Sequence, residues 1–276
     1  MIVSRALSLL RQTWRAPEIF RCAAETPRWP GVTCAIVGLS HPTYPNVLPL
    51  RRGRPIPIET DSDLRTFWQI FARRVYAVHG SDRVILDVGA NIGLFTIYAA
   101  RQAPGARIFA VEPFPATFVR LQQMVHDHQL DDQVTCLNRA VTGCSKTYLM
   151  RDVPRSSQQR SVIALKPGLT GFEVQGTTLA EMIQECRLER IDLLKMDIEG
   201  SEYAALLATP LDVLGTIGRI ALEYHGHCSP YSKQELFRHL SSAGFQITSD
   251  MQNAKGYGVA EAVMSGPRPG LSRQVA

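Results

Sequence analysis

The chain has 276 residues, of which 45% are hydrophobic and 20% charged, a balance typical of an ordinary soluble protein that can bury a sizeable core. This composition excludes a largely disordered chain. The formal net charge is +5, but the 25 Arg and 5 Lys are scattered rather than gathered in one block, so we predict no nucleic-acid partner.

The first residues, MIVSRALSLLRQTWR, combine a short apolar run with Arg5 and Arg11. This run is too short and too charged for a transmembrane helix or a signal peptide, so we expect no stable membrane insertion. Its apolar side chains share one helical face, which suits packing on the protein or in a homo-oligomer. Six Cys without CxxC spacing predict reduced thiols and a cytoplasmic location.

An N-terminal extension covers residues 1–80. Its segment 17–57 holds eight of the seventeen prolines and is expected to be irregular, because proline lacks a backbone donor. The following segment places apolar side chains at helical spacing, which predicts a helix over 61–79 that stops at Gly80. These side chains are Leu64, Phe67, Trp68, Phe71 and Val75.

A second domain is expected over 81–265, because strand-like and helix-like segments alternate there as in a parallel sheet covered by helices. The last two strands lack room for a crossover helix and should pair antiparallel. We expect residues 144–178 to form a hairpin-like insert, placed on the acceptor side, and residues 266–276 to form a flexible tail. The predicted strands are 84–87, 107–111, 133–137, 191–196, 217–225, 245–250 and 257–264, and the predicted helices are 92–102, 115–129, 178–187, 200–208 and 231–243.

A glycine-rich turn, DVGANIG at residues 87–93, joins the first predicted strand to its helix. Such a turn presents backbone N–H groups to a ligand at the carboxyl end of the sheet. The dinucleotide fingerprint needs a glycine at the position of Asn91, whose side chain obstructs a close approach to a pyrophosphate. An NAD(P)-dependent oxidoreductase is therefore the alternative rather than the main interpretation.

Glu112 follows the second predicted strand and can accept hydrogen bonds from both hydroxyls of a ribose. Combined with a glycine turn that lacks the diphosphate fingerprint, it favours a nucleoside cofactor without phosphates, which is S-adenosylmethionine.

A third acidic segment, IDLLKMDIEGSEY at 191–203, ends an apolar strand with Asp197, Glu199 and Glu202. Carboxylates at the mouth of a sheet are costly to desolvate unless they face a ligand or a cation. Asp197 should therefore point into the crevice, whereas Glu199 and Glu202 can also serve the start of the next helix.

Together these motifs resemble the FkbM family of S-adenosylmethionine-dependent methyltransferases. The resemblance covers about residues 84–264 and rests on DVGANIG, VEPFP, NRAV, LLKMDIEGSEYAAL and ALEYH in that order. It implies an α/β fold with a Rossmann-like seven-stranded, mostly parallel sheet, helices on both faces and an antiparallel last strand.

The resemblance also implies a site. Asp87, Gly89, Ala90, Asn91 and Gly93 would line the cofactor, with Glu112 and Pro113 at the ribose, Asn138, Arg139 and Ala140 near the adenine, and Asp197 near the sulfonium or the amino group. The implied reaction is O-methylation of a hydroxyl on a sugar, glycan or small metabolite, with S-adenosylhomocysteine as the product.

Catalytic candidates are Asp197, Glu199 and His225, because an alcohol needs help to lose its proton. Glu223, His225 and His227 share one face of a predicted strand. These three could hold a divalent metal, but no full ligand set is evident, so we predict none. A nucleic-acid methyltransferase is a further alternative, although MDIEG stands where an Asn/Asp-Pro-Pro-aromatic motif is expected. A non-enzymatic binding module is the last.

Overall fold

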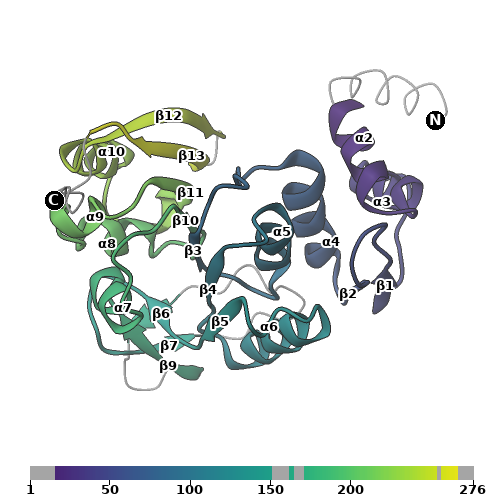
Figure 1. Ribbon diagram of the computed structural model, residues 1–276, viewed down its shortest axis with the longest axis horizontal. Helices are drawn as coiled ribbons and strands as arrows, with labels where there is room; N and C mark the ends of the chain where they lie inside the picture. The colour runs from purple at the N-terminus through teal and green to yellow at the C-terminus, as the bar shows by residue number, and fades with distance from the viewer. Residues whose placement is uncertain (1–15, 151–161, 165–170, 254–255, 267–276) are drawn as a thin grey trace, which may run out of the picture. The chain divides into compact units, whose positions relative to one another are not determined.

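The computed structural model describes residues 16–150, 162–164, 171–253 and 256–266 (Figure 1). The chain divides into two compact units, Met1–Val75 and Tyr76–Ala276, which are treated separately below. The amphipathic segment expected at the N-terminus and nearly all of the expected tail lie outside the described residues.

The first unit contains short regular elements where the proline count predicted an irregular arm. The prolines are compatible with these helices because Pro17 and Pro30 stand in first turns, where a backbone donor is not needed. A two-stranded antiparallel sheet follows. The elements are α2 (Ala16–Glu25), α3 (Trp29–Ile36), β1 (Asn46–Leu48) and β2 (Ile56–Ile58).

The helix predicted over 61–79 is shorter than expected. α4 (Asp61–Phe67) starts at a capping box made by Thr60 and Asp63, and it continues as the π-helix η2 (Trp68–Arg73). Arg74 then ends it with a left-handed φ of 56°. Trp68, Ile70, Phe71 and Ala72 of this π-helix are all buried.

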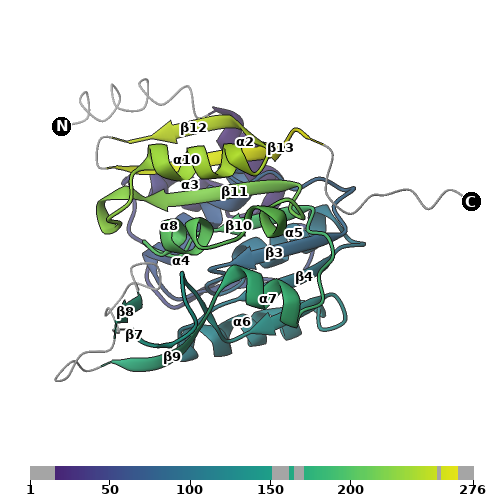
Figure 2. The ribbon, with the colours of Figure 1, turned by 90° about the vertical axis from the view of Figure 1, so that its left-hand side faces the viewer.

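The second unit is built on a seven-stranded sheet in the order β12-β13-β11-β10-β3-β4-β5. Figure 2 shows the strands stacked in this order from β12 at the top. Six strands run in the same direction, and β13 runs antiparallel to both of its neighbours, β11 and β12, which confirms the predicted ending. The strands are β3 (Val84–Val88), β4 (Arg107–Val111), β5 (Val134–Leu137), β10 (Leu193–Met196), β11 (Arg219–His225), β12 (Phe245–Gln252) and β13 (Tyr257–Met264).

Helices cover both faces of this sheet (Figures 1 and 2). One face carries α5 (Leu94–Gln102) and α6 (Pro115–Asp127). The other carries α7 (Leu179–Glu185), α8 (Glu202–Leu207) and α10 (Lys233–Ser242). The sequence reading missed the short α9 (Leu211–Leu214) and the 3₁₀ turn η3 (Gly226–Cys228).

The insert forms a sheet of its own in the order β6-β9-β7-β8. β7 pairs antiparallel with β8 and β9, which agrees with the hairpin-like pattern of the sequence. Its strands are β6 (Ala140–Val141), β7 (Thr147–Met150), β8 (Val162–Ala164) and β9 (Phe172–Thr177).

The strand order reverses at β3, which lies between β4 and β10. Open α/β sheets bind ligands at the carboxyl ends of the strands beside such a reversal, so we expect the site there. Apolar side chains of the strands below are buried, with Leu86, Leu194 and Met196 at zero exposure. A packed core thus lies beneath the turns at this end of the sheet.

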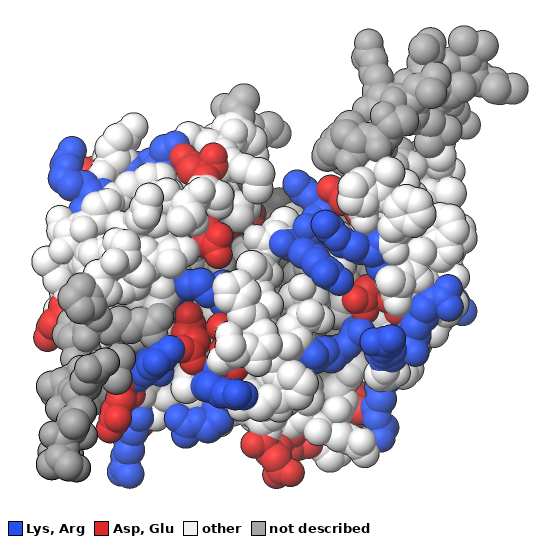
Figure 3. Space-filling view, turned by 45° about the horizontal axis from the view of Figure 1, so that its top comes forward, with Lys and Arg blue, Asp and Glu red and all other residues white. Residues whose placement is uncertain are grey.

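On the face of the second unit seen in Figure 3, acidic and basic side chains are interspersed. This surface agrees with the scattered charges of the sequence. Within the described residues, every helix is too short or too polar to cross a lipid bilayer. All six cysteines lie among these residues and are free thiols.

Candidate active site

The turn between β3 and α5 requires its two glycines. Gly89 has φ +80°, and a Cβ there would lie 1.8 Å from the backbone oxygen of Asp197. Gly93 has φ +90°, and a Cβ would lie 2.9 Å from Leu121 Cδ1. Asn91 is also left-handed, with φ 51°. The turn after β3 and the loop after β10 therefore approach more closely than any side chain at position 89 would permit.

Asp87 supports this turn from below. Its side chain has no exposed surface, and its Oδ2 accepts a hydrogen bond from Thr96 Oγ1 at 2.7 Å. Its Oδ1 lies 3.1 Å from Lys195 Nζ, which also donates to the backbone oxygen of Gly89 at 2.7 Å. Burial lowers the pKa of Lys195, but the charges of Asp87 and Asp197 outweigh it and raise the pKa. Asp87 and Lys195 thus form a buried ion pair under the glycine turn.

Glu112 stands at the end of β4, beside the same turn. Its Oε2 accepts the backbone N–H of Asn91 at 3.0 Å, and its Oε1 accepts that of Phe114 at 2.9 Å. The Asn138 side chain donates to the backbone oxygens of Glu112 and Pro113. These bonds fix the position of the Glu112 carboxylate at the end of β4.

The residues that the family resemblance assigned to the adenine lie just after β5. Asn138 secures the end of β4 as described, and Arg139 Nη1 donates to the backbone oxygen of Asn138. Ala140 is 1% exposed and begins β6. Ala90, in the glycine turn, is 3% exposed. The structure thus brings these predicted residues to one end of the sheet.

The loop after β10 is organised by Glu202, whose side chain has no exposed surface. Its carboxylate accepts the backbone N–H groups of Ile198 and Gly200 at 3.0–3.1 Å. These bonds hold Glu199 at a left-handed φ of 52°, a conformation that costs a non-glycine residue free energy. Glu202 therefore serves the loop, as one sequence interpretation allowed, and it fixes the position of Glu199.

His225 lies between two of these carboxylates. Its Nδ1 is 2.9 Å from Glu202 Oε1, and its Nε2 is 3.3 Å from Glu199 Oε2. Burial alone would lower the pKa of His225, but the hydrogen bond to Glu202 and the charges of Glu202, Glu199 and Asp197 raise it to about 9. Burial is also the main cause that raises the pKa of Glu199 to about 7.

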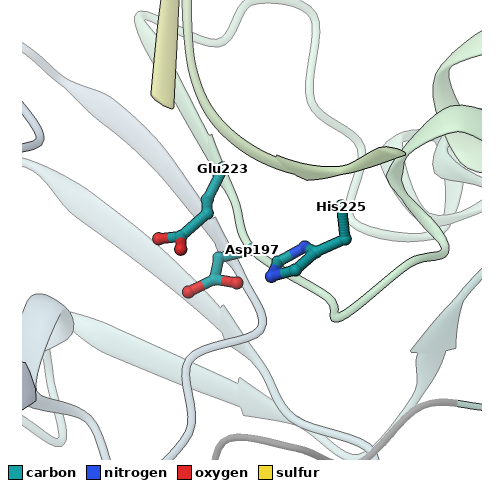
Figure 4. Close-up of side chains that lie close together, drawn as sticks. All are labelled: Asp197, Glu223 and His225. Carbon is teal, nitrogen blue, oxygen red and sulfur yellow. The ribbon is translucent and has the colours of Figure 1, made fainter. Parts of the chain in front are cut away.

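Asp197, Glu223 and His225 converge at the ends of β10 and β11, as Figure 4 shows. One ligand atom from each lies within 4.8 Å of the other two. Asp197 Oδ1 is enclosed and has no hydrogen-bond partner among the described residues. Burial and the charge of Glu223 raise the pKa of Asp197 well above its ordinary value. His227, grouped with Glu223 and His225 from the sequence, is not described at its side chain, and Asp197 takes its place in the cluster.

Sequence reasoning missed two supporting residues. Tyr76 is 4% exposed and donates from its hydroxyl to Glu223 Oε2 at 2.9 Å. From the sequence, Lys195 was assigned no role. The alternation of a strand could have indicated Lys195, because it precedes Asp197 by two residues on the same face. No local pattern indicates Tyr76, whose partner lies 147 residues away.

Comparison with known proteins identifies the family of these motifs. The model of the methyltransferase FkbM domain matches residues 87–247, more than half of the chain, and confirms the resemblance. The chain is 27% identical over 204 residues to 31-O-demethyl-FK506 methyltransferase FkbM of Streptomyces tacrolimicus, with 58% of this chain and 78% of that protein covered.

Two further relatives are longer than the matched region. Methyltransferase 1 of Beauveria bassiana is 30% identical over 161 residues, with 50% of this chain and 64% of that protein covered. AMB antimetabolite synthetase AmbE of Pseudomonas aeruginosa is 29% identical over 197 residues, with 58% of this chain covered. The chain spans only 9% of the length of AmbE.

Proposed function

The chain belongs to the FkbM methyltransferase domain family, and on that premise we propose that it is an S-adenosylmethionine-dependent O-methyltransferase. The observation that carries this proposal is the placement of Glu112. Its carboxylate stands at the end of β4, 8% exposed, and is fixed by the N–H groups of Asn91 and Phe114. A carboxylate at this position of an open α/β sheet suits the two hydroxyls of a ribose.

The glycine turn favours a cofactor without a diphosphate. The N–H of Asn91 donates to Glu112, so it does not point at a phosphate. An NAD(P)-dependent oxidoreductase, which needs free turn amides for the pyrophosphate, is less well supported. In our proposal the turn residues 87–93 lie under the methionine part, residues 138–140 lie near the adenine, and Asp197 lies near the sulfonium or the amino group.

The proposed reaction is an in-line displacement. The acceptor oxygen attacks the methyl carbon, the new C–O bond forms as the C–S bond breaks, and S-adenosylhomocysteine leaves with the electron pair on sulfur. Alignment of oxygen, carbon and sulfur can contribute about 7–11 kcal/mol, and a general base about 10²–10⁴-fold in rate. Positioning is therefore the larger contribution.

Glu199 is our candidate for the group that takes the hydroxyl proton. Its side chain is 28% exposed and stands above His225, so an acceptor can reach it. His225 itself is 4% exposed at its side chain, and both of its ring nitrogens face carboxylates. This geometry favours His225 as a residue that positions its neighbours rather than as the base expected from the sequence.

The acceptor is proposed to be a hydroxyl on a sugar, glycan or small metabolite. The name of the Streptomyces relative describes methylation of 31-O-demethyl-FK506, which supports oxygen as the methylated atom. The insert sheet β6–β9 is the segment we assign to the acceptor side. A cytoplasmic location and a homo-oligomer belong to the same proposal, on the basis of the thiols and the N-terminal sequence.

The test is isothermal titration calorimetry with S-adenosylhomocysteine on the wild type and on Glu112→Ala. Two hydrogen bonds from ribose hydroxyls to a carboxylate are worth about 1.5–3 kcal/mol each, so Glu112→Ala should weaken binding by about 100-fold or more.

Asp192→Ala is the matched control. Asp192 also accepts two backbone N–H groups, from Arg83 and Val84, but at the opposite end of β3. It should lose similar stability and keep its affinity within about twofold. A wild type that does not bind S-adenosylhomocysteine, or a Glu112→Ala variant that binds as the wild type does, contradicts the proposal.

A further inference from the structure

Three side chains of different chemistry meet where β10 and β11 end. The two strands are parallel and pair Met196 with Leu222. Asp197, the residue after β10, therefore lies beside Glu223 at the carboxyl end of β10. Glu223 and His225 are two residues apart on β11 and point to the same face. Figure 4 shows their polar ends turned toward Asp197, and one ligand atom from each lies within 4.8 Å of the others.

One oxygen in this cluster lacks a donor. Asp197 Oδ1 is enclosed and has no hydrogen-bond partner among the described residues, whereas Glu223 accepts from Tyr76 and His225 contacts Glu202. Lys195 and His225 place positive charge nearby, but this oxygen accepts no hydrogen bond among the described residues, and an enclosed carboxylate oxygen without a donor is costly. A positive group bound between Asp197, Glu223 and His225 would compensate the Asp197 carboxylate.

His225 is held as a metal-binding histidine is held. A histidine that coordinates a metal commonly donates its other ring N–H to a carboxylate, which fixes the tautomer and the ring. Here Nδ1 lies 2.9 Å from Glu202 Oε1, and Glu202 is itself fixed by the N–H groups of Ile198 and Gly200. Nε2 is the ring nitrogen that Glu202 does not contact, and it lies 3.3 Å from Glu199 Oε2.

We propose that Asp197, Glu223 and His225 bind a six-coordinate divalent cation of the Mn²⁺ class. Two ligand atoms each about 2.1 Å from one cation lie about 3.0 Å apart when adjacent and about 4.2 Å apart when opposite. The ligand atoms of the cluster lie within 4.8 Å of one another, which is at most about 0.6 Å more than the distance between two opposite ligands. Side-chain rotation can shorten the distances by that amount. The two carboxylates are hard donors that suit Mn²⁺, and the imidazole is a borderline donor that favours a transition metal over Mg²⁺.

The cation has a role in the reaction, and that role rests on the proposed function. Three protein ligands leave coordination positions for the acceptor hydroxyl, whose proton becomes more acidic when its oxygen binds a cation. Coordination through Nε2 replaces the contact of His225 with Glu199 at 3.3 Å. Glu199, whose side chain is 28% exposed, is the neighbouring carboxylate that we assign to take the hydroxyl proton.

A cationic cofactor is the competing occupant. The sulfonium of S-adenosylmethionine could by itself compensate Asp197, and no metal would then be needed. The two cases differ in a direct way, because a metal site binds Mn²⁺ when no sulfonium is present, whereas a sulfonium site does not. S-adenosylhomocysteine, which has no sulfonium charge, allows both conditions to be compared.

The test is calorimetric titration of the full chain with MnCl₂ up to about 5 mM, with and without saturating S-adenosylhomocysteine, supported by the electron paramagnetic resonance signal of free Mn²⁺. We expect one equivalent to bind to the wild type. Asp197→Asn and Glu223→Gln, which keep side-chain shape, should each weaken binding by about tenfold or more. Asp212→Asn, an exposed carboxylate on α9, is the control and should bind as the wild type does.

The outcomes separate the two proposals. Absence of Mn²⁺ binding under both conditions, or unchanged binding in both Asp197→Asn and Glu223→Gln, overturns the metal site. If S-adenosylhomocysteine binds while Mn²⁺ does not, the proposed function stands and the cation is wrong. If Mn²⁺ binds and S-adenosylhomocysteine does not, the metal site stands and the proposed function is wrong. Circular dichroism of each variant identifies any loss of fold.

Discussion

Replacement of Gly89 by alanine tests the close approach on which the site depends. The new Cβ would lie 1.8 Å from the backbone oxygen of Asp197, 2.8 Å from its carbonyl carbon and 3.1 Å from Ile198 Cγ2. Real Cβ contacts essentially never fall under 3.0 Å, so the two chain segments must separate by about 1.2 Å. The obstructing atoms belong to the backbone and cannot rotate away.

The cost follows from three contributions. The left-handed φ of +80° costs alanine about 1 kcal/mol relative to glycine. The hydrogen bond from the Asp197 N–H to the Val88 oxygen, now 3.0 Å, is lost or stretched for about 1 kcal/mol. Overpacking of a rigid core adds about 1–3 kcal/mol. Gly89→Ala should therefore lower the free energy of unfolding by about 3–5 kcal/mol and displace Asp197.

Gly244→Ala is the control in the same unit. Its φ of +96° imposes the same conformational cost, but the nearest atom to the new Cβ is the flexible Met264 Sδ at 3.2 Å. Urea denaturation should show a loss of about 1–2 kcal/mol for Gly244→Ala, and only Gly89→Ala should weaken binding of S-adenosylhomocysteine. Equal losses in the two variants would refute the steric argument.

Two further predictions concern buried charges. Lys195→Met removes the cation that lies 3.1 Å from fully buried Asp87, and it should destabilise the chain by about 3–5 kcal/mol in thermal unfolding. Part of this loss should be recovered in the double variant Lys195→Met/Asp87→Asn, which leaves no unpaired buried charge. A double variant that recovers none of the loss would contradict the ion pair. For Asp192, burial raises the pKa, but the N–H groups of Arg83 and Val84 and the side chain of Arg190 lower it further, below its ordinary value of 3.8. Because the pKa of Asp192 is lower in the folded state, its contribution to stability is fully present above about pH 4 and is lost as the pH falls through the folded-state pKa. The difference in unfolding free energy between the wild type and Asp192→Asn should therefore be constant at pH 5–8 and shrink below about pH 4. A gap that stays constant down to pH 2 would show that Asp192 does not act through its charge.

Some features of the fold could be predicted because they are local. The glycine turn, the alternation of strands and helices and the closing antiparallel pair are written in short stretches of sequence, and the structure confirms the sheet. The helix after residue 60 was predicted too long because apolar spacing does not report where a π turn and a left-handed Arg74 interrupt it. The proline content of the first unit predicted an irregular segment, but a proline in the first turn of a helix is compatible with that helix because no backbone donor is needed there.

The sequence by itself determined which side chains stand at the carboxyl ends of the strands, because strand periodicity and turn chemistry act over a few residues. It therefore indicated Glu112, Asp197 and His225. Only the tertiary structure decided how these groups pair. It placed Lys195 under Asp87, Glu202 behind His225, and Asp197 beside Glu223. Such pairings depend on strand order and on the distance between chain segments far apart in sequence, which no local pattern records.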